Sequence, residues 1–280
     1  MNNGKEVLEF DDLKPYLLLQ NGNYLYKVPY KAGWAVLKVY YGSRSPASRI
    51  VKSLENVILA GQTSYMPKTR LRIERECLDI WHKHGFRVFD TYRDVEVRAP
   101  GCPPGGYMLF EYVSEPKLDA FLRDEVRSVE ERFGVYRKFL NEWSRRHEIA
   151  IAEREPRLVH ENGDGKHVMI LKNEFLWFDF EMIYRNRSKV ARHVSHEIIQ
   201  YLWYLMKNTP PEIRDLLLQE TADHYPEKKR LYEAYNYFFR HPNLFHRFGR
   251  AFERCCKAKA RRPTSKYSVA KRLRDKLDPP

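Results

Sequence analysis

The residues from 158 to 185 read LVHENGDGKHVMILKNEFLWFDFEMIYR, and the rest of the chain is best interpreted outward from this stretch. It begins with a polar loop at 160–167 that contains two glycines. An apolar run at 168–171 follows, then a Lys-Asn-Glu turn, then a second apolar run at 175–178 that leads into two acidic residues. This pattern predicts two short strands joined by a tight turn. A polar loop at one end and carboxylates at the other are typical of a site for a metal ion and phosphates.

The N-terminal third of the chain is rich in strand signals. Residues 15–42 contain runs of Leu, Tyr and Val split by Asn-Gly and Ala-Gly, which predicts consecutive antiparallel strands. Apolar residues at helical spacing predict one helix over 70–85, ending at a glycine. Two more strands are expected at 86–92 and 107–113. No element is predicted over 43–69, because two prolines and a glycine interrupt the pattern.

The remainder of the chain is mostly helical by pattern. Residues 117–146 predict a pair of amphipathic helices with an aromatic-rich apolar face, and 193–252 predict further helices. Strands followed by helices predict an α+β protein of two lobes. We expect a strand-rich lobe over 1–113, a helical lobe over 114–255 and a basic tail over 256–280.

A lysine interrupts one apolar strand segment, Trp34-Ala35-Val36-Leu37-Lys38-Val39, which resembles the Val-Ala-Ile-Lys strand of protein kinases. If Lys38 lies on the buried face of the strand, it needs an anionic partner, such as nucleotide phosphates or a helix glutamate. The helix over 70–85 offers Glu76 as the preferred partner and Glu74 as a substitute. The alternative for Lys38 is the solvent face of an edge strand. For either glutamate the alternative is an ordinary solvated position.

The loop at 160–167 resembles the catalytic loop of kinases, which runs His-x-Asp with an Asn five residues beyond the Asp. Aligned from His160, the Asp position is Asn162 and the Asn position is His167. Downstream, Asp179-Phe180-Glu181 resembles the metal-binding Asp-Phe-Gly or its Asp-Phe-Glu variant.

A histidine in the Asn position is a feature of the lipopolysaccharide core kinases, which phosphorylate Kdo or heptose. The chain resembles this family over residues 15–205. The resemblance implies a protein-kinase-like fold that binds ATP and Mg²⁺ and acts on an anionic glycolipid or sugar acceptor. It also implies roles for individual residues: phosphate binding by Lys38, support of Lys38 by Glu76, a phosphate-covering turn at Asn21 and Gly22, and metal ligation by Asp179, His167 and Glu181.

The loop departs from the kinase pattern at its centre. Asn162 cannot accept a proton from a sugar hydroxyl, as an aspartate there would. Asp164, between two glycines that permit unusual backbone angles, is the leading candidate for this role. Two alternatives stay open: Asp164 is a plain turn residue, or the protein is an inactive kinase-like scaffold that binds nucleotide. We also expect Glu197 to brace His160, unless it merely stabilises a helix N-terminus.

The net charge of +13 indicates an anionic partner. The basic tail, predicted to be partly helical over 266–277, could contact an anionic membrane through 257–277, bind nucleic acid, or simply be solvated. Nucleic acid is less favoured, because Tyr267 alone interrupts the basic residues and base stacking needs more aromatic groups.

The sequence carries no membrane-spanning run of about 18 apolar residues and no apolar signal segment. Four cysteines without a Cys-x-x-Cys spacing favour reduced thiols over a zinc site. We therefore expect a cytoplasmic protein, and the resemblance and the basic tail together imply peripheral contact with the inner membrane.

Overall fold

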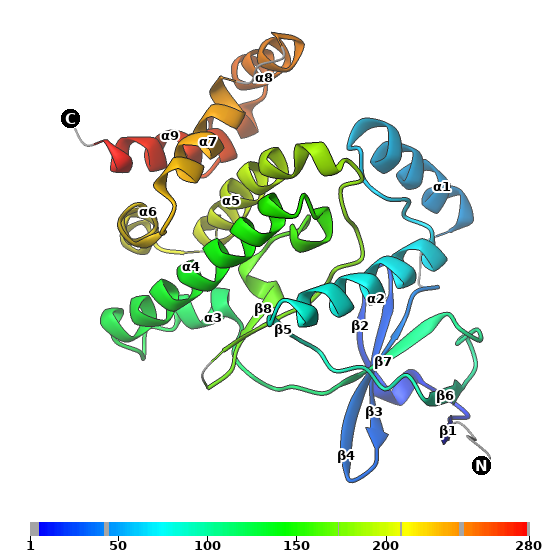
Figure 1. The fold of residues 1–280 in the computed structure, drawn as a ribbon. Coiled ribbons are helices and arrows are strands. Elements are labelled where there is room, and N and C mark those ends of the chain that lie inside the picture. The colour runs from blue at the N-terminus through cyan, green and yellow to red at the C-terminus, as the bar shows by residue number, and fades with distance from the viewer. Residues whose placement is uncertain (1–5, 42–44, 173, 208, 241–243, 279–280) are drawn as a thin grey trace. The chain divides into compact units, whose positions relative to one another are not determined.

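The computed structural model describes residues 6–41, 45–172, 174–207, 209–240 and 244–278. The protein is α+β, with most strands in its N-terminal part and most helices in its C-terminal part (Figure 1). It divides into two compact units, which we call unit 1 and unit 2. Unit 1 comprises residues 1–115 and 176–185, and unit 2 comprises 116–175 and 186–280. Residues 176–185, expected in the helical lobe, thus group with the strand-rich unit, and the basic tail groups with the helical one.

Unit 1 is built on a four-stranded antiparallel sheet in the order β2-β3-β4-β7. Its strands are β2 (Leu17–Gln20), β3 (Tyr24–Tyr30), β4 (Gly33–Val39) and β7 (Tyr107–Glu111). The antiparallel strands predicted over 15–42 therefore form. Residues 21–23 connect β2 to β3, and the turn between β3 and β4 is Lys31-Ala32, with Gly33 already in β4.

Two further parallel strand pairings occur in unit 1. β1 (Glu6–Glu9) pairs in parallel with β6 (Val95–Arg98), and neither strand was predicted. The strand expected at 86–92 is reduced to β5 (Arg87–Val88), which pairs in parallel with β9 (Phe175–Trp177). Strands this short carry too few residues for an alternating pattern to be recognised.

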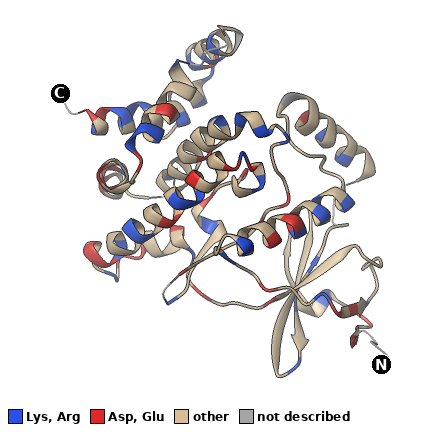
Figure 2. Ribbon diagram, viewed as in Figure 1, with Lys and Arg blue, Asp and Glu red and all other residues tan. Residues whose placement is uncertain are grey.

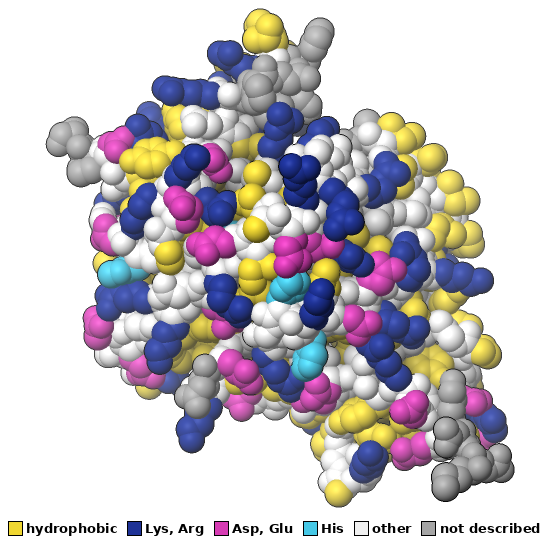
Figure 3. Space-filling view, viewed as in Figure 1, with side chains coloured by type: hydrophobic (Ala, Val, Ile, Leu, Met, Phe, Trp, Pro, Cys, Tyr) yellow, Lys and Arg dark blue, Asp and Glu magenta, His cyan; other side chains and the backbone are white. Residues whose placement is uncertain are grey.

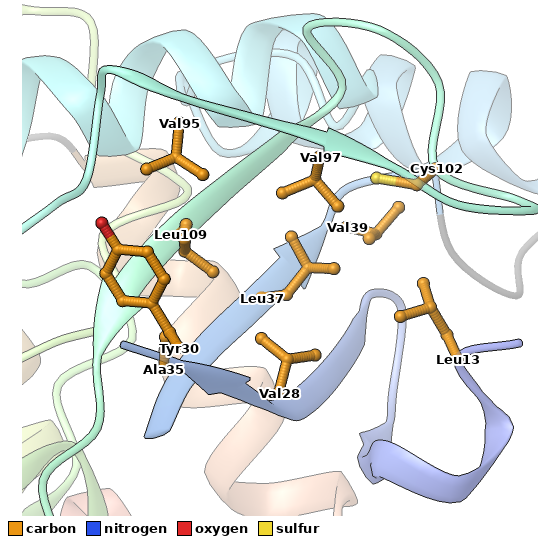
Figure 4. Packing of buried hydrophobic residues seen from close by; sticks show 10 residues of the cluster. All are labelled: Leu13, Val28, Tyr30, Ala35, Leu37, Val39, Val95, Val97, Cys102 and Leu109. Atoms are coloured by element: carbon orange, nitrogen blue, oxygen red, sulfur yellow. The ribbon is translucent and has the colours of Figure 1, made fainter. Parts of the chain in front are cut away.

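The core of unit 1 lies against one face of the four-stranded sheet (Figure 4). Alternate residues of β4, Ala35, Leu37 and Val39, point into it because successive side chains of a strand face opposite sides. Val95 and Val97 of β6 pack against them. The residues between them in β4, including Lys38, must therefore face the opposite side of the sheet.

Two helices belong to unit 1, and one of them was missed. α1 (Pro46–Leu54) and a following π-helical turn (Glu55–Leu59) occupy the segment for which no element was predicted. Pro46 was taken as a breaker, but it is the first residue of the helix, where a missing N–H costs nothing. The Ser45 hydroxyl caps the helix by accepting from the Ser48 N–H.

The predicted helix over 70–85 forms as α2 (Pro67–Lys83), also with a proline at its start. Gly85 follows its end with φ 72°, a left-handed conformation that glycine adopts without strain. The Gly85 and Phe86 N–H groups donate to His82 and Trp81 carbonyls, so the helix stops where the sequence predicted.

Unit 2 is mostly helical, and its one strand is β8 (Val168–Ile170) among the described residues. Its α-helices are α3 (Leu118–Arg123), α4 (Val129–Ala152), α5 (Val190–Lys207), α6 (Pro211–His224), α7 (Lys228–Phe239), α8 (Leu244–Cys256) and α9 (Lys266–Leu277). The helices predicted over 117–146, 193–252 and 266–277 are all present. The turn expected at 172–174 includes residue 173, which lies outside the described residues.

The core of unit 2 follows the predicted aromatic face of α4. Tyr136, Phe139 and Trp143 lie one turn apart and are fully buried. Tyr201 of α5 and Tyr225 pack against Trp143, with ring centroids 5.2 and 5.8 Å away. In the described part of the chain, no helix has the length and apolar character needed to cross a membrane.

Candidate functional site

The site in unit 1 is centred on Lys38, which β4 presents on the face opposite the apolar core. Lys38 is only 6% exposed. Its Nζ lies 3.0 and 2.7 Å from Oε1 and Oε2 of Glu74, a buried residue of α2. The alternative of a solvated lysine on an edge strand is therefore wrong, because Lys38 is buried and β4 lies between β3 and β7.

Two further carboxylates, both from the segment after β9, approach the same ammonium group. Glu181 lies 2.7 Å and Asp179 3.5 Å from Lys38 Nζ. Glu181 is itself fixed by Arg70 of α2, whose Nε donates to its Oε2 at 2.9 Å, and by the side-chain amide of Asn23. Sheet, helix and post-β9 segment thus meet at one charged cluster.

The partner of Lys38 is Glu74, and the preference for Glu76 has to be corrected. Glu76 forms an ion pair with Arg72 along the helix surface, at 2.5 Å. The signal was present in the sequence: Glu74 lies one and two turns before Leu78 and Trp81, on the buried face of α2. The face of the helix decides which side chain reaches the sheet.

Burial and charge act against each other in this cluster. Burial alone would lower the pKa of Lys38, but Glu181, Glu74 and Asp179 outweigh it and raise that pKa above its ordinary value. Burial raises the pKa of Glu74, and Lys38 opposes that shift. The Tyr40 hydroxyl donates to Glu74 Oε2 at 2.5 Å. Lys38 is therefore a permanent cation that anionic oxygens must surround.

Asp179 differs from the other two carboxylates around Lys38 in its exposure and its backbone conformation. Its side chain is about one third exposed, the most open of the three carboxylates around Lys38. Its φ is 75°, in the left-handed region that non-glycine residues enter at a cost and that is common at binding sites. The neighbouring Trp177 and Phe180 pack on Trp81 with centroids 5.5 and 4.4 Å away, which holds the backbone on both sides of Asp179.

The other predicted site residues lie in unit 2, where Glu197 of α5 organises the loop at 160–167. Glu197 is fully buried, and its Oε2 accepts from the His160 backbone N–H at 2.9 Å. Trp143 Nε1 donates to its Oε1 at 3.0 Å, and Arg146 forms a short ion pair with it. Burial would raise the pKa of Glu197, but Arg146 and His147 outweigh it and lower that pKa to about 2. Glu197 braces His160 as expected, from mid-helix rather than from a first turn.

The loop side chains have clear structural partners. His160 is buried, with Nδ1 2.7 Å from the Tyr201 hydroxyl. His167 Nδ1 lies 3.2 Å from the Asn162 carbonyl oxygen. Asp164 is buried and accepts from the Lys166 N–H at 3.1 Å, so it caps the short helical turn Gly165–His167. These are the contacts of a turn residue, and they leave the catalytic role of Asp164 a proposal.

Close packing explains the glycines beside Asp164. A Cβ on Gly163 would lie 2.3 Å from the Tyr201 ring, and one on Gly165 would lie 2.4 Å from Leu205. The loop therefore lies directly against α5.

The structure groups the predicted residues into two sets. Unit 1 brings together Lys38, Asp179 and Glu181; the Asn21–Gly22 turn precedes Asn23, whose amide contacts Glu181. Unit 2 brings together His160, Asn162, Asp164 and His167. Within the described ranges, no three His, Cys, Asp or Glu side chains form a ready metal site. Arg70 was not predicted.

No protein-family model matches the chain, and no curated protein matches it either.

The two glutamates of α2 provide a matched test of the ion-pair assignment. Glu74→Gln weakens the buried charge-assisted hydrogen bonds that Glu74 accepts from Lys38 and Tyr40, and should lower the free energy of unfolding by on the order of 2 kcal/mol. Glu76→Gln removes a half-exposed pair and should change it by about 0.5 kcal/mol or less. Urea unfolding monitored by tryptophan fluorescence measures both, and equal losses would contradict the assignment.

The buried His147 predicts a pH dependence of stability. Burial lowers the pKa of His147 to about 4, so the folded protein keeps the ring neutral while the unfolded chain takes up a proton near pH 6.5. The free energy of unfolding should therefore be highest above about pH 6.5. Protonation of His147 alone should lower it by on the order of 1–2 kcal/mol as the pH falls to 5.

His147→Gln keeps hydrogen-bonding capacity toward Tyr225 without titrating. The loss of unfolding free energy between pH 8 and pH 5 should therefore be smaller in this variant than in the parent. An unchanged loss would mean that His147 is not the titrating group.

Proposed function

We propose that this protein is an ATP-dependent phosphotransferase with a protein-kinase-like fold. Its acceptor would be a sugar hydroxyl of a lipopolysaccharide core precursor, and it would work in the cytoplasm at the inner membrane face. The observation that carries the proposal is the buried Lys38, held by Glu74 of a neighbouring helix beside two carboxylates that follow a strand. This combination is what kinase-like enzymes use to bind nucleotide phosphates and Mg²⁺.

The composition of the cluster fits a cationic ligand better than a purely structural role. Lys38 and Arg70 supply two positive charges against the three carboxylates of Glu74, Asp179 and Glu181. A buried cluster with excess negative charge is costly, and a divalent cation offsets that cost. Asp179 and Glu181 provide oxygen ligands, which Mg²⁺ prefers, and bound Mg²⁺ would neutralise charge on the transferred phosphoryl group.

Each residue of the cluster then has a chemical task. Lys38 would pair with the phosphate oxygens, because its raised pKa keeps it cationic at every physiological pH. Glu74 would fix the ammonium group in place from α2. Arg70 and Asn23 would orient Glu181, so that its carboxylate needs little reorganisation to bind a metal ion.

The acceptor hydroxyl also needs a group that orients it, and Asp164 is our candidate.

A specific observation favours a second function, that of a nucleotide-binding scaffold without transfer activity. Asp164 already caps a turn and lies 3.3 Å from Lys166 Nζ, while Asn162 cannot accept a proton. Turnover decides between the two functions.

Nucleotide binding is tested by thermal unfolding with and without ATP and Mg²⁺. Ligand at about one hundred times its Kd should raise the melting temperature by about 5 °C. Asp179→Asn and Lys38→Met should abolish the rise, while the surface variant Glu76→Gln should retain it. The absence of a shift with every nucleotide tested would refute the proposal.

Phosphate transfer is tested with radiolabelled ATP and Kdo- or heptose-containing acceptors. Asp164→Asn keeps the turn-capping oxygen but removes the base, so it should lower transfer by about 10²–10⁴-fold while the nucleotide-induced thermal shift persists. Asn162→Ala is the control and should retain most activity. Nucleotide binding by the parent protein without transfer to any acceptor would favour the scaffold.

A further inference from the structure

Helix α8 (Leu244–Cys256) presents its apolar side to solvent. Leu244, Phe248 and Phe252 recur every four residues, so they lie on one side of the helix. Their exposed fractions are 60%, 72% and 69%. Large apolar side chains exposed in a row are unusual in a soluble protein and mark an interaction surface.

The polar side of α8 faces inward, which reverses the usual orientation of an amphipathic helix. Arg250 lies over the rings of Tyr237 and Phe238 of α7, with its guanidinium carbon 4.2 and 5.3 Å from their centroids. Glu253 Oε2 accepts from the hydroxyl of Tyr267 in α9 at 2.7 Å. Arg254 similarly lies 4.8 Å from the ring of Phe239. These contacts anchor α8 by its charged side and keep the phenylalanines outside.

Basic residues surround and follow this apolar row. The sequence from 244 to 262 contains one acidic residue, Glu253, and several basic residues: Arg247, Arg250, Arg254, Lys257, Lys259, Arg261 and Arg262. Lys257, Lys259 and Arg262 are exposed. Lys257 pairs with Glu253 at 3.0 Å. The basic residues of α9 are also partly engaged: Lys266 donates to Gln200 at 3.0 Å and Arg272 to Asp215 at 2.8 Å. Lys and Arg as a whole are spread over both units (Figure 2), so the concentration after α8 is a local feature.

We infer that α8 docks the protein on an anionic lipid bilayer. Phe248 and Phe252 would enter the boundary between headgroups and acyl chains, while the exposed basic residues at 247, 257, 259 and 262 contact lipid phosphates. The inference is independent of the proposed phosphotransferase activity, because it involves neither Lys38 nor Asp179.

Charge and area favour a membrane over a second copy of the chain. Two α8 helices brought together would place two strongly basic segments side by side, which like-charge repulsion opposes. Three side chains also form a smaller apolar patch than a stable dimer interface requires. A bilayer can bind both the apolar side chains and the basic residues, since it has an apolar interior beneath an anionic surface.

Helix α1 provides a useful comparison. Hydrophobic side chains also gather on the surface of α1 in Figure 3, where Ile50, Val51 and Leu54 are exposed. The sequence from 46 to 60 carries only Arg49 and Lys52 against Glu55, so this surface lacks the charge that would indicate an anionic partner. We assign it no ligand.

Vesicle co-sedimentation of the full chain, without nucleotide, tests the inference. The protein should bind vesicles of phosphatidylcholine with about one third phosphatidylglycerol, and bind pure phosphatidylcholine at least about tenfold less. The double variant Phe248→Glu, Phe252→Glu should lose at least about tenfold in affinity for the anionic vesicles. Val126→Glu adds a charge at another exposed apolar position of unit 2 and should leave binding unchanged.

The cysteines give a direct reading of insertion. Cys255 and Cys256 are exposed whereas Cys77 and Cys102 are buried, so a Cys256→Ser protein can be labelled selectively at Cys255 with an environment-sensitive fluorophore. Cys255 lies seven residues after Phe248, on the same side of the helix. Anionic vesicles should shift the emission to the blue, and neutral vesicles should not.

Three outcomes would overturn the inference. The first is binding to anionic vesicles that survives Phe248→Glu, Phe252→Glu unchanged. The second is a dimer, detected by analytical ultracentrifugation, that this double variant abolishes while vesicles do not bind. The third is binding of single-stranded RNA or DNA, lost with Lys257→Glu, Lys259→Glu, in the absence of vesicle binding.

Discussion

A buried ammonium group must be paired, and in unit 1 this constraint applies at Lys38. The strand β4 fixes the lysine on one face of the sheet, and α2 contributes Glu74 from across that face. The segment after β9 contributes Glu181, which reaches the cluster from more than one hundred residues away in the sequence. Removing one partner of a buried charge costs several kcal/mol, because the desolvation penalty remains. Sheet, helix and distant segment are thus tied together by one charge.

Unit 2 follows the same principle with the opposite sign. Glu197 is a buried carboxylate, and Arg146 and Trp143 on α4 hold it from one side. The other oxygen of Glu197, Oε2, accepts from the backbone N–H of His160. This charge-assisted hydrogen bond fixes the start of the polar loop to α5. In both units, a buried charge fixes the position of a segment, and the local sequence pattern alone does not determine that position.

The fold was largely predictable where the pattern is local. Runs of strand-forming residues split by turn signals located the strands of the main sheet, and helical spacing located α2, α4 and α5. What failed depended on information beyond the pattern: Pro46 begins a helix instead of ending one. The candidate site was predictable to the level of Lys38, whose apolar strand required an anionic partner. The glutamate that pairs with Lys38 was not predictable, because choosing Glu74 over Glu76 requires knowing which face of α2 covers the sheet.

Net charge, like local pattern, predicts only part of how the protein binds its partners. A charge of +13 predicts an anionic partner but not where it binds, because many cations are already used within the fold. Lys38 and Arg146 are buried and paired with carboxylates, and Arg250 lies over aromatic rings. Periodicity shows that α8 has an apolar side, and it cannot show which way that side faces. Because arginines on its polar side anchor α8 to α7, the phenylalanines are left to solvent, and the charge that matters for a partner is the exposed group beside them.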